Sequence, residues 1–293
     1  MTDLVKELWE TVFLAALAYI VLWIAWQKQF FHRTLRDVVT APINLSHVLT
    51  VFAIYFGSVF FFIVPLQKLC GALFQWLHIP SSTLHFSVAV HFSLSLLIAC
   101  LLALFFFMLQ PETRKIIWRR FPQDSSYKQD LLIALLAWPI SYPVLLCVSQ
   151  VLDLLTYLLF HVRELPDQTA VHFLKMTIDQ PVSFLLNMIT IVFMAPFIEE
   201  IIFRGFLQTY IRKFFRPAGA IALSSFCFAC FHFSPEQGLG NIPLIGSLWA
   251  FALFLGFVYE RQGSLLSPIC LHATFNALSV LNVYFFCKQT QCF

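Results

Sequence analysis

Two adjacent glutamates and an arginine interrupt an apolar run in the second half of the chain. Residues 195–215 read APFIEEIIFRGFLQTYIRKFF, which places Glu199, Glu200 and Arg204 among apolar neighbours. Glu200 and Arg204 are four residues apart, the spacing at which a carboxylate and a guanidinium meet on a helix. Glu199 points about 100° away around the helix, and no basic residue lies three or four positions from it. A carboxylate placed in this way can act as a general base toward water.

Three further polar residues follow in apolar surroundings. His232 comes four residues after Phe228, and we expect the phenylalanine to pack beside it. His272 and Asn276 are also four residues apart, so they share one face of a helix. His232 could share a water molecule with a carboxylate or protonate a leaving amine, while His272 and Asn276 could stabilise the oxyanion of a tetrahedral intermediate. Together with the glutamates, this set suits the attack of water on an amide bond.

The same residues also allow a metal-dependent form of this chemistry. Glu199, His232 and His272 would provide two imidazoles, one carboxylate and an open position, which suits zinc with a bound water. The chain has no HExxH motif, and the three ligands would come from three separate helices. We favour the metal-free form and keep zinc as the alternative.

The rest of the chain is apolar enough to make lipid its main solvent. Of 293 residues, 60% are hydrophobic and 11% are charged, and the apolar residues gather in long runs. A helix needs roughly 20 apolar residues to cross about 30 Å of hydrocarbon. The runs lack the alternation of lipid-facing strands, so we expect an all-α, polytopic integral membrane protein with about eight transmembrane helices. The eight runs are 11–26, 46–66, 86–109, 130–160, 183–203, 217–232, 242–259 and 266–286.

The candidate residues all lie in or at the ends of the last four runs, which suggests that the two halves of one membrane domain have different roles. We interpret residues 1–182 as scaffold and residues 183–293 as the catalytic part. The scaffold includes a basic loop, 111–130, that we expect to lie at the cytoplasmic surface against anionic lipid headgroups. Lone histidines and most cysteines in the spans are expected to serve packing; the histidines are His85, His91 and His161.

Lysines and arginines predict the orientation in the membrane. If the segment after the first run is cytoplasmic, the inner loops hold most of these residues, and both termini are non-cytoplasmic. The net charge of +3 then reports topology, and we expect no nucleic-acid partner. The inner residues are Lys28, Arg33, Arg36, Arg114, Lys115, Arg119, Arg120, Lys128, Arg212, Lys213, Arg216 and Arg261, and the outer ones are Lys6, Lys68, Arg163, Lys175 and Lys288.

The three motifs, taken together and in order, resemble those of a known family. Glu199-Glu200-x-x-x-Arg204, Phe228-x-x-x-His232 and His272-x-x-x-Asn276 are similar to the motifs of the CPBP family of CAAX proteases and bacteriocin-processing enzymes, with its Rce1-type and Abi-type members. The resemblance implies an intramembrane endopeptidase in which Glu199 activates water, His232 assists, and His272 and Asn276 hold the oxyanion. It also implies a hydrophobic or lipidated peptide or protein as the substrate.

Other functions fit parts of the same pattern. Buried charges also mark the ion pathways of transporters, although a transporter predicts polar sites in two symmetry-related halves. A non-catalytic membrane adaptor or immunity protein could carry the same motifs, and the sequence does not distinguish it from a protease. The pair of Glu200 and Arg204 could also serve only as a brace between helices.

Overall fold

The computed structural model describes residues 2–31, 42–79, 83–120, 126–162, 165–166 and 168–290. Within these ranges the regular structure is helical, apart from an isolated bridge between Arg119 and Ser264. Seven of the described helices are long and apolar enough to cross a membrane. The prediction of an all-α, polytopic membrane protein is therefore confirmed. The seven are Leu4–Gln27, Leu45–Trp76, Leu84–Met108, Tyr127–Phe160, Pro181–Ile211, Pro235–Gln262 and Leu266–Phe286.

The sixth predicted run, 217–232, forms a shorter helix. Helix α10 (Pro217–Cys230) has 14 residues, which corresponds to about 21 Å at 1.5 Å per residue. This length is less than the roughly 30 Å of a typical hydrocarbon core. An eighth crossing, on which the predicted orientation of both termini depends, would therefore need the residues that flank α10.

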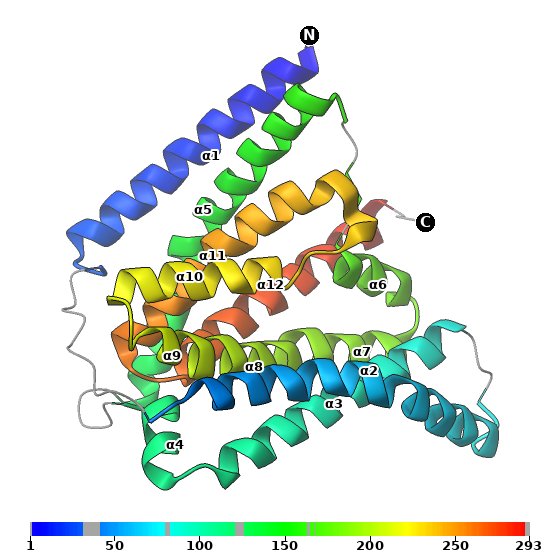
Figure 1. Cartoon of the computed structure of the whole chain (residues 1–293). Coiled ribbons are helices and arrows are strands. Elements are labelled where there is room, and N and C mark those ends of the chain that lie inside the picture. Colours follow the sequence, from blue (N-terminus) through cyan, green and yellow to red (C-terminus); the bar gives the residue numbers. More distant parts are fainter. Residues whose placement is uncertain are drawn as a thin grey trace. The chain divides into compact units, whose positions relative to one another are not determined.

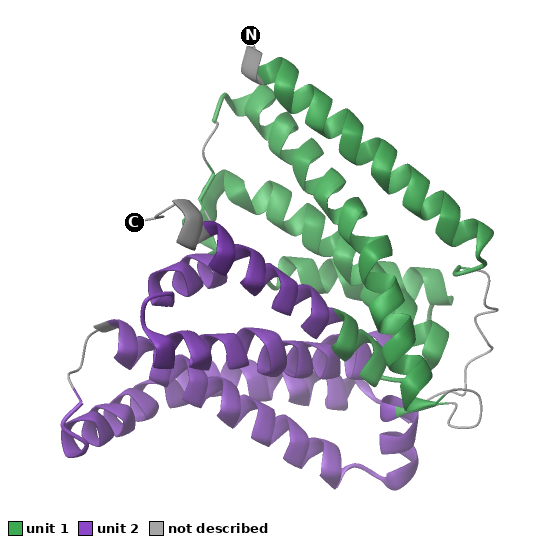
Figure 2. Cartoon of the chain, turned by 180° about the vertical axis from the view of Figure 1, so that it is seen from behind, with its two compact units in different colours: residues 1–40, 119–168, 211–271 green, residues 41–118, 169–210, 272–293 purple. Residues whose placement is uncertain are grey.

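Two compact units make up the chain, and each combines segments from both halves of the sequence (Figure 2). Unit 1 comprises residues 1–40, 119–168 and 211–271, and unit 2 comprises residues 41–118, 169–210 and 272–293. The predicted division into scaffold and catalytic parts concerns function, and it stays a prediction.

In unit 1, helices pack closely around α11 (Asn241–Gln262). This helix contacts α5 (Tyr127–Phe160) and α10, and α5 also contacts α1 (Thr2–Gln27). Gly246 allows the close approach to α5, because a Cβ at this position would collide with the side chain of Leu152. The short helix η3 (Pro235–Gly240) joins α10 to α11.

The part of the basic loop that belongs to unit 1, which begins at Arg119, makes buried polar contacts within that unit. The backbone N–H of Arg120 donates to the Gly263 carbonyl at 2.6 Å. Its side chain is buried and lies 3.4 Å from the Glu260 carboxylate, which Arg212 approaches to 3.5 Å. Residues 121–125 of the predicted loop 111–130 lie outside the described residues.

Unit 2 contains the long run Pro181–Ile211 up to Tyr210 and most of α12 (Leu266–Thr290). The run passes through α7, α8 and α9, which follow one another in Figure 1. It packs against α2 and α3, which also pack against each other. Besides these segments, the unit comprises α2 (Leu45–Trp76), α3 (Thr83–Met108), α4 (Pro111–Trp118) and α6 (Thr169–Thr177).

Candidate active site

The two glutamates lie on a run whose helical register changes twice. The run begins with α7 (Pro181–Ile189) and continues through the π-helix η1 (Thr190–Met194) into α8 (Ala195–Glu200). A second π-helix, η2 (Ile201–Gln208), leads to α9 (Thr209–Ile211). Glu199 and Glu200 therefore end a short α-helical segment between two π-helical ones. π-helical turns of this kind occur frequently at functional sites.

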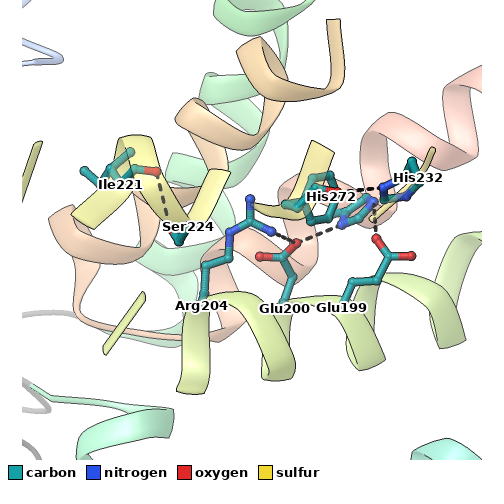
Figure 3. A network of polar contacts seen from close by, with 8 residues as sticks. Glu199, Glu200, Arg204, Ile221, Ser224, His232 and His272 are labelled. Carbon is teal, nitrogen blue, oxygen red and sulfur yellow. Dashed lines mark hydrogen bonds and ion pairs between the residues drawn. The ribbon is translucent and has the colours of Figure 1, made fainter. Parts of the chain in front are cut away.

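Glu200 and Arg204 form the ion pair that their spacing predicts. Arg204 Nη1 donates to Glu200 Oε1 at 2.8 Å, and both side chains are 0% exposed (Figure 3). Seven of the eight residues of η2 are buried, so this part of the run faces protein on nearly all sides. A charge-assisted hydrogen bond in such surroundings is short and directional.

His272 of α12 makes a second contact with the same carboxylate. Its Nδ1 lies 2.9 Å from Glu200 Oε1, the atom that also accepts the hydrogen bond from Arg204. Because this oxygen acts as an acceptor, the Nδ1 of His272 is the donor and carries a proton. The Nε2 of a neutral ring then holds the lone pair, and protonation of the ring would add the proton at Nε2.

Glu199 faces the other side of the same imidazole. The Nε2 of His272 lies 3.8 Å from Glu199 Oε2, an ion-pair distance longer than a direct hydrogen bond. Local spacing predicted no basic neighbour for Glu199 on its own helix, and the structure supplies one from α12. With both carboxylates ionised, Arg204 offsets one negative charge, and a protonated His272 would offset the second.

Asn276 lies one turn beyond His272 and contacts the backbone of the long run. Its Nδ2 donates to the carbonyl of Ile191 at 2.8 Å. Two side chains of α12 therefore bind the run that carries the glutamates, His272 at its carboxylates and Asn276 at its backbone. The structure brings together five of the six predicted site residues in unit 2: Glu199, Glu200, Arg204, His272 and Asn276.

The sixth residue, His232, belongs to unit 1, where it follows the end of α10. Its Nδ1 lies 2.9 Å from the carbonyl oxygen of Phe228. A carbonyl only accepts, so this nitrogen is the donor and the lone pair of the neutral ring is at Nε2. The rings of Phe228 and His232 are 4.8 Å apart between centroids, as expected from the sequence. In this tautomer, His232 can accept a proton at Nε2 and so act as a base.

Comparison with known families adds an independent observation. Residues 181–278 match a family model described as type II CAAX prenyl endopeptidase Rce1-like. This region is similar to the Rce1-like family. It covers about a third of the chain and contains all six predicted site residues. The search of curated proteins and the search of solved structures found no match. The similarity to the Rce1-like family supports an intramembrane endopeptidase of the CAAX type in general.

Helices that precede the Rce1-like region also line this part of unit 2. Phe52 of α2 packs edge-on against Phe203 with ring centroids 5.7 Å apart, and Phe105 of α3 lies 5.7 Å from Phe206. Helix α2 also carries Tyr55, a polar residue of unit 2. Tyr55 was not among the predicted site residues, because a lone tyrosine in an apolar run gives no signal of its position.

The structure also bears on the predicted zinc ligands of the Rce1-like region. Among the described residues, no group of three histidine, cysteine, aspartate or glutamate side chains is arranged to hold a metal ion. Of the three predicted ligands, Glu199 and His272 belong to unit 2, where their side chains lie 3.8 Å apart, and His232 belongs to unit 1. The zinc alternative stays a prediction.

Proposed function

We propose that this protein is an intramembrane endopeptidase that hydrolyses a peptide bond with water activated by Glu199. The observation that carries the proposal is the arrangement of His272 between Glu199 and Glu200, inside the segment that matches the Rce1-like family. The arrangement combines a carboxylate that can take a proton with an imidazole held in one orientation. These are two of the parts that amide hydrolysis requires.

In the proposed reaction, Glu199 removes a proton from a water molecule, and the water oxygen bonds to the carbonyl carbon of the substrate. The carbonyl oxygen becomes an oxyanion, and the tetrahedral intermediate then breaks its C–N bond. The leaving nitrogen receives the proton that Glu199 took from water, which regenerates the carboxylate of Glu199, so the products are a carboxylic acid and an amine. His232 would assist, because its Nε2 can hold and release a proton while its Nδ1 is held by the Phe228 carbonyl.

His272 and Asn276 would stabilise the oxyanion. A protonated His272 can donate from Nε2, the nitrogen on the side of Glu199. Asn276 has one amide N–H directed to Ile191 and a second N–H that remains for a ligand. Glu200 and Arg204 do not touch the substrate in this scheme. Their role is to hold the Nδ1 of His272, which fixes the ring and its tautomer.

For the substrate, we propose a lipidated protein or peptide with a CAAX-type C-terminus. Support comes from the family description, which names CAAX prenyl endopeptidases. Cleavage would remove the residues that follow the lipidated cysteine.

The proposal can be tested with purified protein in lipid nanodiscs and two peptides of the same CAAX sequence, one farnesylated and one unmodified. We expect the farnesylated peptide to lose its last three residues, as measured by mass spectrometry. The unmodified peptide should be cleaved at least tenfold more slowly. Equal cleavage of both peptides would contradict the proposed substrate, and cleavage of neither would favour a non-catalytic adaptor.

A further inference from the structure

A proline precedes the two glutamates by one helical turn, and it removes a hydrogen-bond donor from the run. At the end of η1 the backbone N–H of Ala195 donates to the Thr190 carbonyl, five residues back. In this π register, the donor to the Ile191 carbonyl would be the N–H of residue 196. Residue 196 is a proline, which has no N–H. The Ile191 carbonyl must therefore find its donor outside its own helix.

Asn276 of α12 provides that donor. Its Nδ2 lies 2.8 Å from the Ile191 oxygen. Because a carbonyl oxygen only accepts, the side of the amide that faces Ile191 must be the NH2 group. The contact thus fixes which way the Asn276 amide is turned, a choice that matters for any ligand that its second N–H would bind.

The surroundings of this contact are apolar. Ile191 packs with Ala277 and Val283 around a cluster of buried residues, Leu174, Val192 and Val280. A backbone carbonyl in such surroundings is costly to leave without a hydrogen bond. The hydrogen bond therefore holds the side chain of Asn276 at the Ile191 carbonyl.

Two polar contacts connect α12 to the long run. Asn276 binds at Ile191, and His272, one turn earlier on α12, binds at Glu200. Pro196 is between these two points on the run and is buried. Two fixed points define the rotation and the axial position of α12 against the run, which a single point would leave undetermined.

We propose that Pro196 is a positioning residue, which captures the side chain of Asn276 by leaving the Ile191 carbonyl without a helical donor. The capture holds α12 in the register that places His272 between the two glutamates. This role needs no contact between Pro196 and the substrate. Its effect on catalysis rests on the proposed function, whereas its effect on the hydrogen bond does not.

The test is a double-mutant cycle on thermal stability, measured for the full chain in nanodiscs. Asn276→Leu removes the donor at nearly constant size, and Asn276→Ala serves as a second variant if the leucine does not fit. Pro196→Ala restores a backbone N–H and with it a helical donor for Ile191. We expect Asn276→Leu to lower Tm by about 3 °C or more in the native background, and by less than half of that amount in the Pro196→Ala background.

Matched controls separate this coupling from general effects of prolines and asparagines in membrane helices. Pro65→Ala changes an exposed proline inside α2, and its effect should add to that of Asn276→Leu. Asn187→Leu removes an asparagine whose Nδ2 donates to the Thr177 hydroxyl at 3.1 Å, and its effect should add to that of Pro196→Ala. Additive losses for Pro196 and Asn276 would overturn the proposal.

Kinetics provide the second readout. If the protein cleaves a CAAX peptide, Pro196→Ala should lower kcat roughly tenfold and leave KM unchanged, because misplaced groups slow the chemical step. Pro65→Ala should leave kcat unchanged. An unchanged kcat in Pro196→Ala would overturn the positioning of the site. The stability cycle requires no activity, so it tests the hydrogen bond even if the proposed function fails.

Discussion

His272 lies between two adjacent glutamates of another helix, with Nδ1 2.9 Å from Glu200 and Nε2 3.8 Å from Glu199. His272 and Glu200 are 72 positions apart in sequence, so the contact depends on the packing of α12 against the long run. The two carboxylates face different nitrogens of this ring. Glu200 also binds Arg204 and is fully buried, while the side chain of Glu199 is 15% exposed. Glu199 is therefore the carboxylate that is more accessible to water.

The two nitrogens of His272 can be tested separately. In His272→Asn the side-chain amide can replace Nδ1, and in His272→Gln it can replace Nε2. We expect His272→Asn to keep the hydrogen bond to Glu200 and most of the thermal stability, but to lose cleavage activity. His272→Gln should lower Tm further than His272→Asn does. Equal stability of the two variants would contradict the role assigned to the contact with Glu200.

Arg204 and Glu200 should be coupled in stability. Arg204→Met leaves a buried carboxylate with one partner fewer, which we expect to cost about 3–5 kcal/mol of unfolding free energy. Glu200→Gln combined with Arg204→Met removes both charges, so the double variant should be more stable than Arg204→Met alone. The measurement is reversible unfolding in mixed micelles. A double variant less stable than Arg204→Met would contradict this expectation.

Chelation tests the zinc alternative, in which Glu199, His232 and His272 would bind the ion. We expect cleavage to continue unchanged after dialysis against a strong chelator, because the proposed mechanism uses the carboxylate of Glu199 directly. Metal analysis of the dialysed protein provides the control that the ion was removed. Loss of activity that returns when zinc is added back would contradict the metal-free mechanism.

Orientation can be checked with reporters fused to each end of the chain. The distribution of lysines and arginines predicts that both termini are non-cytoplasmic. This result requires an even number of crossings, including one by the segment that contains α10. If the reporters lie on opposite sides of the membrane, seven crossings are present and α10 does not complete an eighth.

Long apolar runs made the helical membrane fold predictable, because in lipid a helix satisfies its own backbone hydrogen bonds. The pair of Glu200 and Arg204 was predictable for a similar reason, since its geometry is local to one helix. The length of α10 was harder to predict. Apolar residues continue past Cys230, but the helix ends there, ahead of Pro235 and the turns around His232.

Contacts between distant helices could not be predicted in the same way. Nothing in the spacing of His272 and Asn276 shows that they bind Glu200 and the Ile191 carbonyl, because these contacts depend on how α12 is rotated. The sequence pattern predicted that polar residues would gather, but it did not predict which atoms would meet. Pro196 did give a local signal, because a proline inside an apolar helix lacks a backbone N–H. The consequence of the missing N–H can be interpreted only once the contact of Asn276 with the Ile191 carbonyl is known.

The cleavage rate of Glu199→Gln most directly tests Glu199 as the base, because this change keeps the size of the side chain and removes its ability to take a proton. Asp153→Asn is the matched control, because Asp153 is a membrane-span carboxylate of unit 1 that binds Ser149. With a farnesylated CAAX peptide and both variants shown to be folded, we expect Glu199→Gln to lower kcat by roughly 100-fold or more. Asp153→Asn should retain activity, and equal turnover by Glu199→Gln and the native protein would contradict the assignment of Glu199 as the base.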